Sequence, residues 1–319
     1  MPVRAFFSGL ALALGLGLAG PAAASEDGAN PLAVFQVREG RLFDTGWQLA
    51  RANRAFCRER VPSIGLLIHD AGNYAKSDEV RRALSLEGDI GVQAVATRSP
   101  AAHAGIRRNV TILEIDGRAV DAGFAPTNPT VQRTLNIEAT MAESLADGDL
   151  SLSLSPMPKK VVLRGVDVCK ATFRLEPGKR AYAGDQTVFF GHRFMGFDLD
   201  REAFAAAVAH ELAHVVLAHP ASKLAEDWGM GETRESERVA DRMMPWLLYN
   251  AGYDPRGAAD FMRAWGPRHS GGILRKRTHD GWDERLQMIL EEIAILYAQI
   301  RRNRWQPGEA DWASRFAEN

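Results

Sequence analysis

The chain has 319 residues, of which 46% are hydrophobic and 25% are charged. These values are near the averages of globular proteins, so they exclude a disordered or fibrous protein, and the length suggests two domains. The 39 lysines and arginines are balanced by 40 aspartates and glutamates, so the basic excess of a nucleic-acid-binding protein is absent. With only 2 cysteines, any metal site must use histidine and carboxylate ligands.

Residues 1–24 have the pattern of a secretory signal peptide. Arg4 supplies the positive charge, an apolar run covers 5–20, and three alanines precede Ser25. A retained membrane anchor is the alternative, but the apolar run is shorter than the ~20 residues of a spanning helix. We therefore expect a periplasmic or secreted mature chain that begins near Ser25 and has no membrane span.

Export to an oxidising compartment favours a disulfide bond between Cys57 and Cys169. In the loop-entropy model, such a long closed loop stabilises the fold by up to ~4 to 5 kcal/mol. Two separately buried thiols are the alternative, because the sequence does not show whether the two Cα atoms come within reach.

The first elements expected after residue 25 are a helix and a strand. Apolar residues recur at near-helical spacing over 41–57, and 63–70 reads as a strand. Between 86 and 168, short alternating runs separated by Gly, Pro and Asp predict a small β-rich module with one helix at 136–145.

The rest of the chain is expected to be mostly helical. Strands are predicted at 171–175 and 186–194, before a helix that ends ahead of Pro220. Three further helices are predicted at 235–250, 254–265 and 281–302.

The helix before Pro220 contains the run His210-Glu211-Leu212-Ala213-His214. Two imidazoles one turn apart share one helical face and can bind one zinc ion. Glu211 lies about 100° round the helix from His210, where it can act as a general base on a water at the metal. The alternative is that both are core histidines whose ring nitrogens have hydrogen-bond partners. Burying these side chains in so apolar a segment is costly, however, without a metal.

A hydrolytic zinc site needs three protein ligands and one open position. Pro220 stands where the long metzincin pattern has its third histidine, so that class is excluded. His219 lies about 180° round a regular helix from His210 and cannot share its ion. Glu237 and Asp241 are one turn apart on the next helix; one could bind zinc and the other accept the far N–H of a zinc-bound imidazole. A solvated acidic helix start is the alternative.

Together, the two motifs resemble the signature of HtpX-like zinc metallopeptidases (family M forty-eight), relatives of the CAAX prenyl protease. The resemblance covers about residues 169–300 and is carried by His210-Glu211-Leu212-Ala213-His214 and Glu237-Arg238-Val239-Ala240-Asp241. It implies a zincin-like domain of gluzincin type with one Zn²⁺ per chain. It further implies that Glu237 is the third ligand beside His210 and His214, and that Asp241 supports the ligands from behind.

A late element of that family is also matched. Thr278-His279-Asp280 with Arg285 resembles its His-Pro element and the accompanying arginine. His279 is therefore expected to hold the oxyanion or to act as a switch at the metal. A surface histidine beside the basic run 275–277 is the alternative.

The middle module resembles a PDZ domain of bacterial envelope proteases over about 86–166. The match rests on two runs, Ser99-Pro100-Ala101-Ala102-His103-Ala104-Gly105-Ile106 and Ile112-Leu113-Glu114-Ile115-Asp116-Gly117. It implies a site that binds extended polypeptides by strand addition, with a carboxylate loop around Gly88 and Gly91. A β insert that only braces the peptidase is the alternative.

The sequence therefore predicts an α+β fold in which a small β-rich PDZ-like domain is inserted N-terminal to the zinc helix. The expected parts are a signal peptide at 1–24, a helix and strand packing on the peptidase body at 25–85, the PDZ-like domain at 86–166, a mostly helical zinc metallopeptidase domain at 167–305 and a C-terminal tail at 306–319. The expected function is exported, zinc-dependent endopeptidase activity on partly unfolded or exposed chains, in envelope protein quality control. The alternative is a PDZ-type binding or chaperone-like protein with a latent or structural zinc site.

Overall fold

The computed structural model describes residues 31–127, 131–269 and 280–316. The expected signal peptide and His279 therefore lie outside the described residues. Helices and several small sheets make a mixed α+β fold, as predicted. No helix in the described part of the chain is long and apolar enough to cross a membrane.

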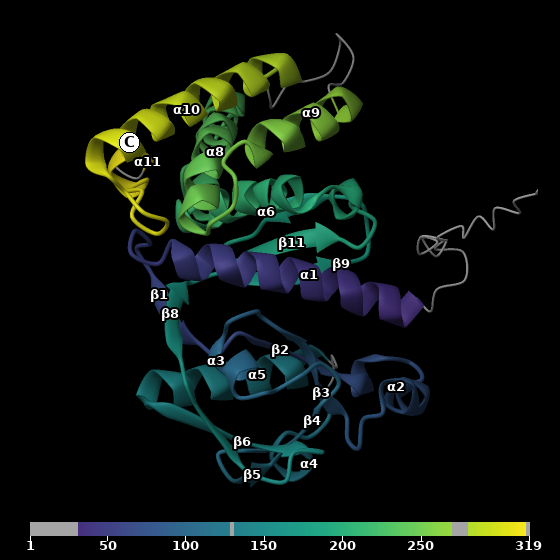
Figure 1. Ribbon diagram of the computed structural model, residues 1–319. Coiled ribbons are helices and arrows are strands. Elements are labelled where there is room, and N and C mark those ends of the chain that lie inside the picture. Colours follow the sequence, from purple (N-terminus) through teal and green to yellow (C-terminus); the bar gives the residue numbers. More distant parts are fainter. Residues whose placement is uncertain (1–30, 128–130, 270–279, 317–319) are drawn as a thin grey trace, which may run out of the picture.

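The described chain has two hydrophobic cores, which we call the body and the β module. The first helix runs between them, with helices and strands of the body on one side and the β module on the other (Figure 1). The helices of the body are α1 (Pro31–Ala52), α6 (Arg201–Val216), α7 (His219–Ala225), α8 (Met230–Asn250), α9 (Gly257–His269), α10 (Trp282–Asn303) and α11 (Ala313–Phe316), with a 3₁₀ turn η3 (Met195–Asp198).

The body also contains a three-stranded sheet in the order β10-β11-β9. Its strands are β9 (Thr172–Glu176), β10 (Ala181–Ala183) and β11 (Thr187–Gly191). β11 is parallel to β9 and antiparallel to β10. Phe190 of β11 and Phe204 of α6 are buried with ring centroids 6.0 Å apart, so aromatic packing holds the sheet against α6.

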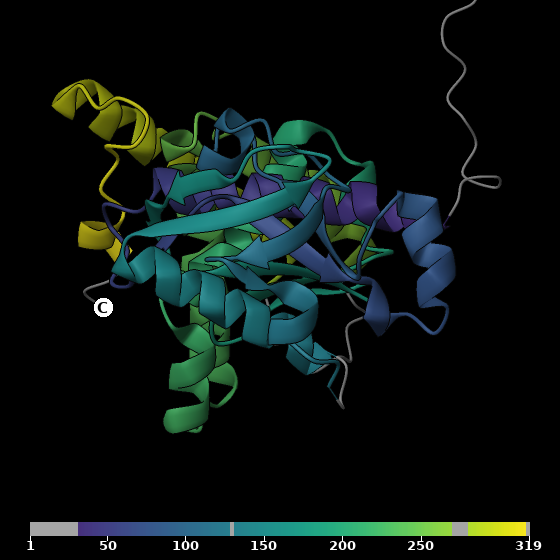
Figure 2. The ribbon, with the colours of Figure 1, turned by 90° about the horizontal axis from the view of Figure 1, so that it is seen from below.

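The β module is built on a six-stranded sheet in the order β2-β3-β4-β6-β7, with β5 paired to β4. Its elements are β2 (Leu66–Asp70), η2 (Ala71–Asn73), α2 (Ser77–Leu84), β3 (Ile90–Val95), α3 (Pro100–His103), β4 (Thr111–Ile115), β5 (Arg118–Ala119), α4 (Val120–Gly123), α5 (Val131–Asp147), β6 (Asp149–Ser155) and β7 (Val161–Arg164). Leu150, Leu152 and Leu154 of β6 are buried while the serines between them are half-buried, so the alternating pattern matches one covered face. α5 runs beside the strands of this sheet (Figure 2).

The β module begins earlier than the sequence indicated. β2 pairs antiparallel with β3 from Leu66↔Val95 to Asp70↔Ile90, and Ile68 is buried in the core of the module. The strand expected to pack on the body is thus an edge strand of the module, and the expected boundary at residue 86 is about 20 residues too late. Pairing with a distant strand decided the position of this segment.

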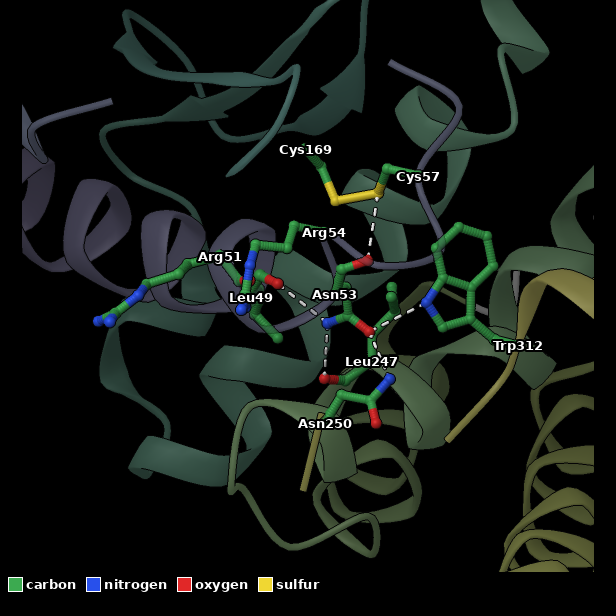
Figure 3. The surroundings of a disulfide bond; sticks show 9 residues. All are labelled: Leu49, Arg51, Asn53, Arg54, Cys57, Cys169, Leu247, Asn250 and Trp312. Carbon is green, nitrogen blue, oxygen red and sulfur yellow. Dashed lines mark hydrogen bonds between the residues drawn. A yellow bond between two sulfur atoms is a disulfide. The ribbon is translucent and has the colours of Figure 1, made fainter. Parts of the chain in front are cut away.

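Two segments of the chain connect the body to the β module, and these two segments are paired with each other. β1 (Arg60–Ser63) and β8 (Val166–Cys169) pair antiparallel. Cys57 and Cys169 form the predicted disulfide bond, with their Cα atoms 5.6 Å apart. Asn53 lies beneath it and bonds to neighbours from three parts of the body, as Figure 3 shows.

The C-terminal segment is part of the body rather than a tail. Trp312 is 1% exposed and donates from Nε1 to Asn53 Oδ1 at 3.0 Å, and Phe316 is also buried. Burying two aromatic rings explains why the segment expected to be a tail at 306–319 folds back, within the residues described, onto the core.

Candidate metal centre

Helix α6 is buried on almost every side because alanines and other apolar residues cover its surface. Asp200 caps its N-terminus by accepting a hydrogen bond from the backbone N–H of Ala203 at 2.8 Å. His210 and His214 belong to this helix and are only 8% and 7% exposed. Two imidazoles in so apolar an environment need polar partners or a metal.

Three potential ligands converge between α6 and α8. His210 Nε2 lies 3.4 Å from His214 Nε2 and 3.4 Å from Glu237 Oε2. His214 Nε2 lies 3.6 Å from Glu237 Oε1, and one ligand atom from each residue falls within 4.8 Å of the others. Bonds of about 2.0 Å in a tetrahedral zinc site place neighbouring ligand atoms about 3.3 Å apart, so the donor set and its spacing fit zinc.

Asp241 supports this cluster from behind. Its Oδ1 lies 3.2 Å from His210 Nδ1, and its carboxylate accepts two hydrogen bonds from the Arg285 guanidinium at 2.6 and 2.7 Å. Burial raises the pKa of Asp241, but Arg285 and His210 outweigh that effect and hold the pKa below its usual range. Asp241 thus faces Nδ1 of His210, whereas Glu237 faces Nε2 of the same ring.

The two histidines differ in their electrostatic surroundings. Burial lowers the pKa of His210, but Asp241 and Glu237 outweigh burial and raise it above the ordinary imidazole value. Burial and the neighbouring His210 lower the pKa of His214 to about 3. His214 is therefore neutral and able to offer a lone pair, whereas a metal at His210 would displace a proton.

The Glu211 carboxylate has no hydrogen bond or ion pair to another side chain in the described ranges. Burial, together with the nearby Glu237 carboxylate, raises its pKa to about 7, although His210 opposes the shift. A carboxylate with a pKa near neutrality is suited to accepting and returning a proton. The predicted base and the three predicted ligands are therefore brought together by α6 and α8.

One neighbour of the cluster was not expected. His219 Nδ1 lies 2.9 Å from His214 Nδ1, although a regular helix would carry it away from the metal side. α6 ends at Val216, and Ala218 adopts a left-handed conformation with φ of 57°, so the chain turns back. Pro220 was the available signal, because proline tends to interrupt a helix and is favoured in the first turn of a new one.

Of the late element, Thr278-His279-Asp280 with Arg285, the structure describes Asp280 and Arg285. Asp280 accepts two hydrogen bonds from the guanidinium of Arg238, at 2.6 and 3.2 Å. Arg285 donates to Asp241 on α8. Asp280 and Arg285 thus both contact α8 through charged side chains.

At Gly91 the structure has a paired strand where part of a carboxylate loop was expected around Gly88 and Gly91. Gly91 lies inside β3 and is paired with His69 on one side and Thr111 on the other, so its strand is central rather than free. An apolar groove of about 200 Å³ lies instead along the edge strand β2. It is lined by side chains of β2, α5, α1 and β9, among them Leu66, Ile68, Met141, Leu145, Trp47 and Phe173.

Comparison with known proteins adds no family to this description. No protein-family model matches the chain, and no curated protein matches it. The geometry of the cluster is therefore the basis on which a function can be assigned.

Proposed function

We propose that this chain is a zinc-dependent endopeptidase of the HtpX-like, gluzincin type, with one Zn²⁺ per chain. The observation that carries the proposal is the convergence of His210, His214 and Glu237 beside the carboxylate of Glu211. Three protein ligands leave one position for water and substrate, which is the ligand count of hydrolytic zinc sites.

Zinc, when bound, supplies a Lewis acid that polarises a peptide carbonyl and lowers the pKa of water. Glu211 would accept the proton of the attacking water at its carboxylate and return it to the leaving amine. Asp241 would fix the ring of His210, because a carboxylate facing Nδ1 leaves Nε2 free to bind. His279 remains our candidate for the oxyanion or switch role.

The substrate we propose is an extended polypeptide. β10 is an edge strand of the body sheet and contacts α6, the helix that carries His210 and His214, so we place the substrate chain beside this strand. An unfolded or exposed segment can add to an edge strand, whereas a folded one cannot. The groove along β2 is a second place where the PDZ-like module would hold such a chain.

The compartment we propose is the periplasm or the exterior of the cell. The Cys57–Cys169 disulfide fits an oxidising environment. The signal pattern at 1–24 accounts for how the chain would reach it.

The test is metal-dependent cleavage of an unfolded protein such as casein. Purified protein should bind one zinc and cut casein, a chelator should abolish cutting, and added zinc should restore it. Glu237→Gln should lose both zinc affinity and cleavage because it replaces a charged ligand oxygen. Glu235→Gln is the matched control, since Glu235 is an exposed glutamate on the same helix whose ion pair with Arg238 is at the surface.

Zinc bound by wild type without any cleavage would contradict the peptidase. That result would favour the alternative, a PDZ-type binding or chaperone-like protein with a latent or structural site, for which the groove along β2 offers the binding surface.

A further inference from the structure

We infer that His219 is a positioning residue that holds His214 in the orientation and tautomer needed to bind the metal. The inference rests on the proposed zinc site and extends it to a residue outside both motifs. His219 Nδ1 lies 2.9 Å from His214 Nδ1, on the side of the ring opposite the nitrogen that faces Glu237.

The protonation pattern of the two rings follows from this contact. If His214 binds metal through Nε2, its Nδ1 carries the hydrogen and needs an acceptor. His219 Nδ1 is the atom placed to accept it, so His219 carries its own hydrogen on Nε2. Metal-bound histidines commonly donate their other N–H to a carboxylate, carbonyl or water; here a neutral imidazole takes that place.

The local fold is built to bring His219 to this position. The left-handed Ala218 ends the straight path of α6, and His219 opens α7. The rings of His214 and His219 then meet edge to face with centroids 5.0 Å apart. A left-handed conformation is unfavourable for alanine, so the contact forms at a local conformational cost.

The ring of His219 also contacts the indole ring of Trp228. The ring of Trp228 lies 5.9 Å from that of His219. Trp228 Nε1 donates to Glu226 Oε2 at 2.9 Å, which fixes the indole. A chain of contacts thus runs from Trp228 through His219 to His214, and a second chain runs from Arg285 through Asp241 to His210.

The two supports differ in charge. His210 faces a carboxylate that is paired with a guanidinium, whereas His214 faces an uncharged ring. Removing His219 should therefore leave the ligand His214 present and its N–H unpaired, rather than remove a charge from the site.

The experiment measures zinc affinity of the full protein by competition with a chromophoric chelator. Asparagine and leucine have nearly the same shape, but Asn Oδ1 can occupy the position of His Nδ1 and accept the hydrogen bond, whereas leucine cannot. We expect His219→Leu to weaken zinc binding about 10- to 100-fold and His219→Asn to retain most of the affinity. His219→Gln, whose amide lies one carbon further out, should resemble His219→Leu.

His103→Leu is the control, because His103 is exposed and lies in the β module; it should leave zinc affinity unchanged. Circular dichroism of each variant shows that the fold is retained, and His219→Gln serves if the leucine variant does not fold. Equal affinity of the Asn, Leu and Gln variants would overturn the inference. Zinc-binding wild type that cuts no peptide would overturn the proposed function alone, whereas wild type that binds no zinc would overturn both.

Discussion

His69 and His214 are both buried histidines, but only His214 has a partner on each side. His69 lies on β2 of the β module, and neither of its ring nitrogens has a hydrogen-bond partner among the described residues. Burial lowers its pKa to about 4, so the ring is neutral in the folded protein. Unlike His214 of the candidate metal centre, His69 contributes packing without a side-chain hydrogen bond among the described residues.

Because of this lowered pKa, we expect His69 to make the folded protein less stable in acid. Below the ordinary imidazole pKa of about 6.5, the unfolded chain binds a proton at His69 that the folded chain does not bind. Stability should therefore fall as the pH drops from about 6.5 to about 4. The His69→Leu variant lacks this imidazole, so its free energy of unfolding should not show this loss in acid. The free energy of unfolding of the variant minus that of wild type should therefore increase by up to about 3 kcal/mol as the pH falls from 7 to 4.

Urea unfolding of chelator-treated proteins at several pH values measures this difference. The exposed His103→Leu variant should follow wild type at every pH. Parallel curves for His69→Leu and wild type would show that the folded protein accepts a proton at His69.

Among the secondary-structure elements, helix α1 packs against both the body and the β module. It contacts β9 on one side and β3 on the other. Two of its glycines lie in different surroundings: a Cβ at Gly46 would be 2.3 Å from the buried ring of Phe173, whereas one at Gly40 would be 3.9 Å from Ala94 Cβ. Only the first is needed for close packing.

The two Gly→Ala variants should therefore shift stability in opposite directions. Gly46→Ala should lower the free energy of unfolding by about 1 to 3 kcal/mol, because the Phe173 ring must move. Gly40→Ala should raise it by about 0.5 to 1 kcal/mol, because alanine favours the helix and makes an ordinary contact. Denaturant unfolding checks both; a stabilised Gly46→Ala would mean that β9 can draw away from α1.

Local sequence patterns predicted where helices and strands lie better than they predicted which other elements these pack against or pair with. The apolar surface of 201–216 and the alternation in 150–154 could be read directly, and spacing placed His210 and His214 on one face of α6. Spacing left open which of Glu237 and Asp241 faces the two histidines, and only the family resemblance implied Glu237. The strand at 66–70 was recognised, but its pairing with β3 depends on residues at least 20 positions away. His219 was missed because a single left-handed residue, Ala218, redirects the chain.

In the molecule as a whole, the chain passes between the body and the β module at the paired strands β1 and β8. The Cys57–Cys169 disulfide beside them closes a separation of 112 residues. The whole β module lies within that loop, so the bond restricts the unfolded chain strongly.

Replacing both cysteines by alanine should lower the free energy of unfolding by about 2 to 5 kcal/mol. Wild type unfolded in the presence of a reductant should approach the variant, and the variant should not respond to reductant. Identical unfolding midpoints for oxidised wild type and the double variant would contradict this role of the disulfide.

The proposed function of the molecule is hydrolysis of peptide bonds with Glu211 as the base. It is tested by the rate of casein cleavage by wild type and Glu211→Gln prepared identically, with bound zinc determined in both and Glu235→Gln as the control. Because Glu211 is not among the three converging ligands, we predict that Glu211→Gln keeps its zinc while cleavage falls at least about 10²- to 10⁴-fold. Cleavage at the wild-type rate by zinc-loaded Glu211→Gln would show that Glu211 is not the base.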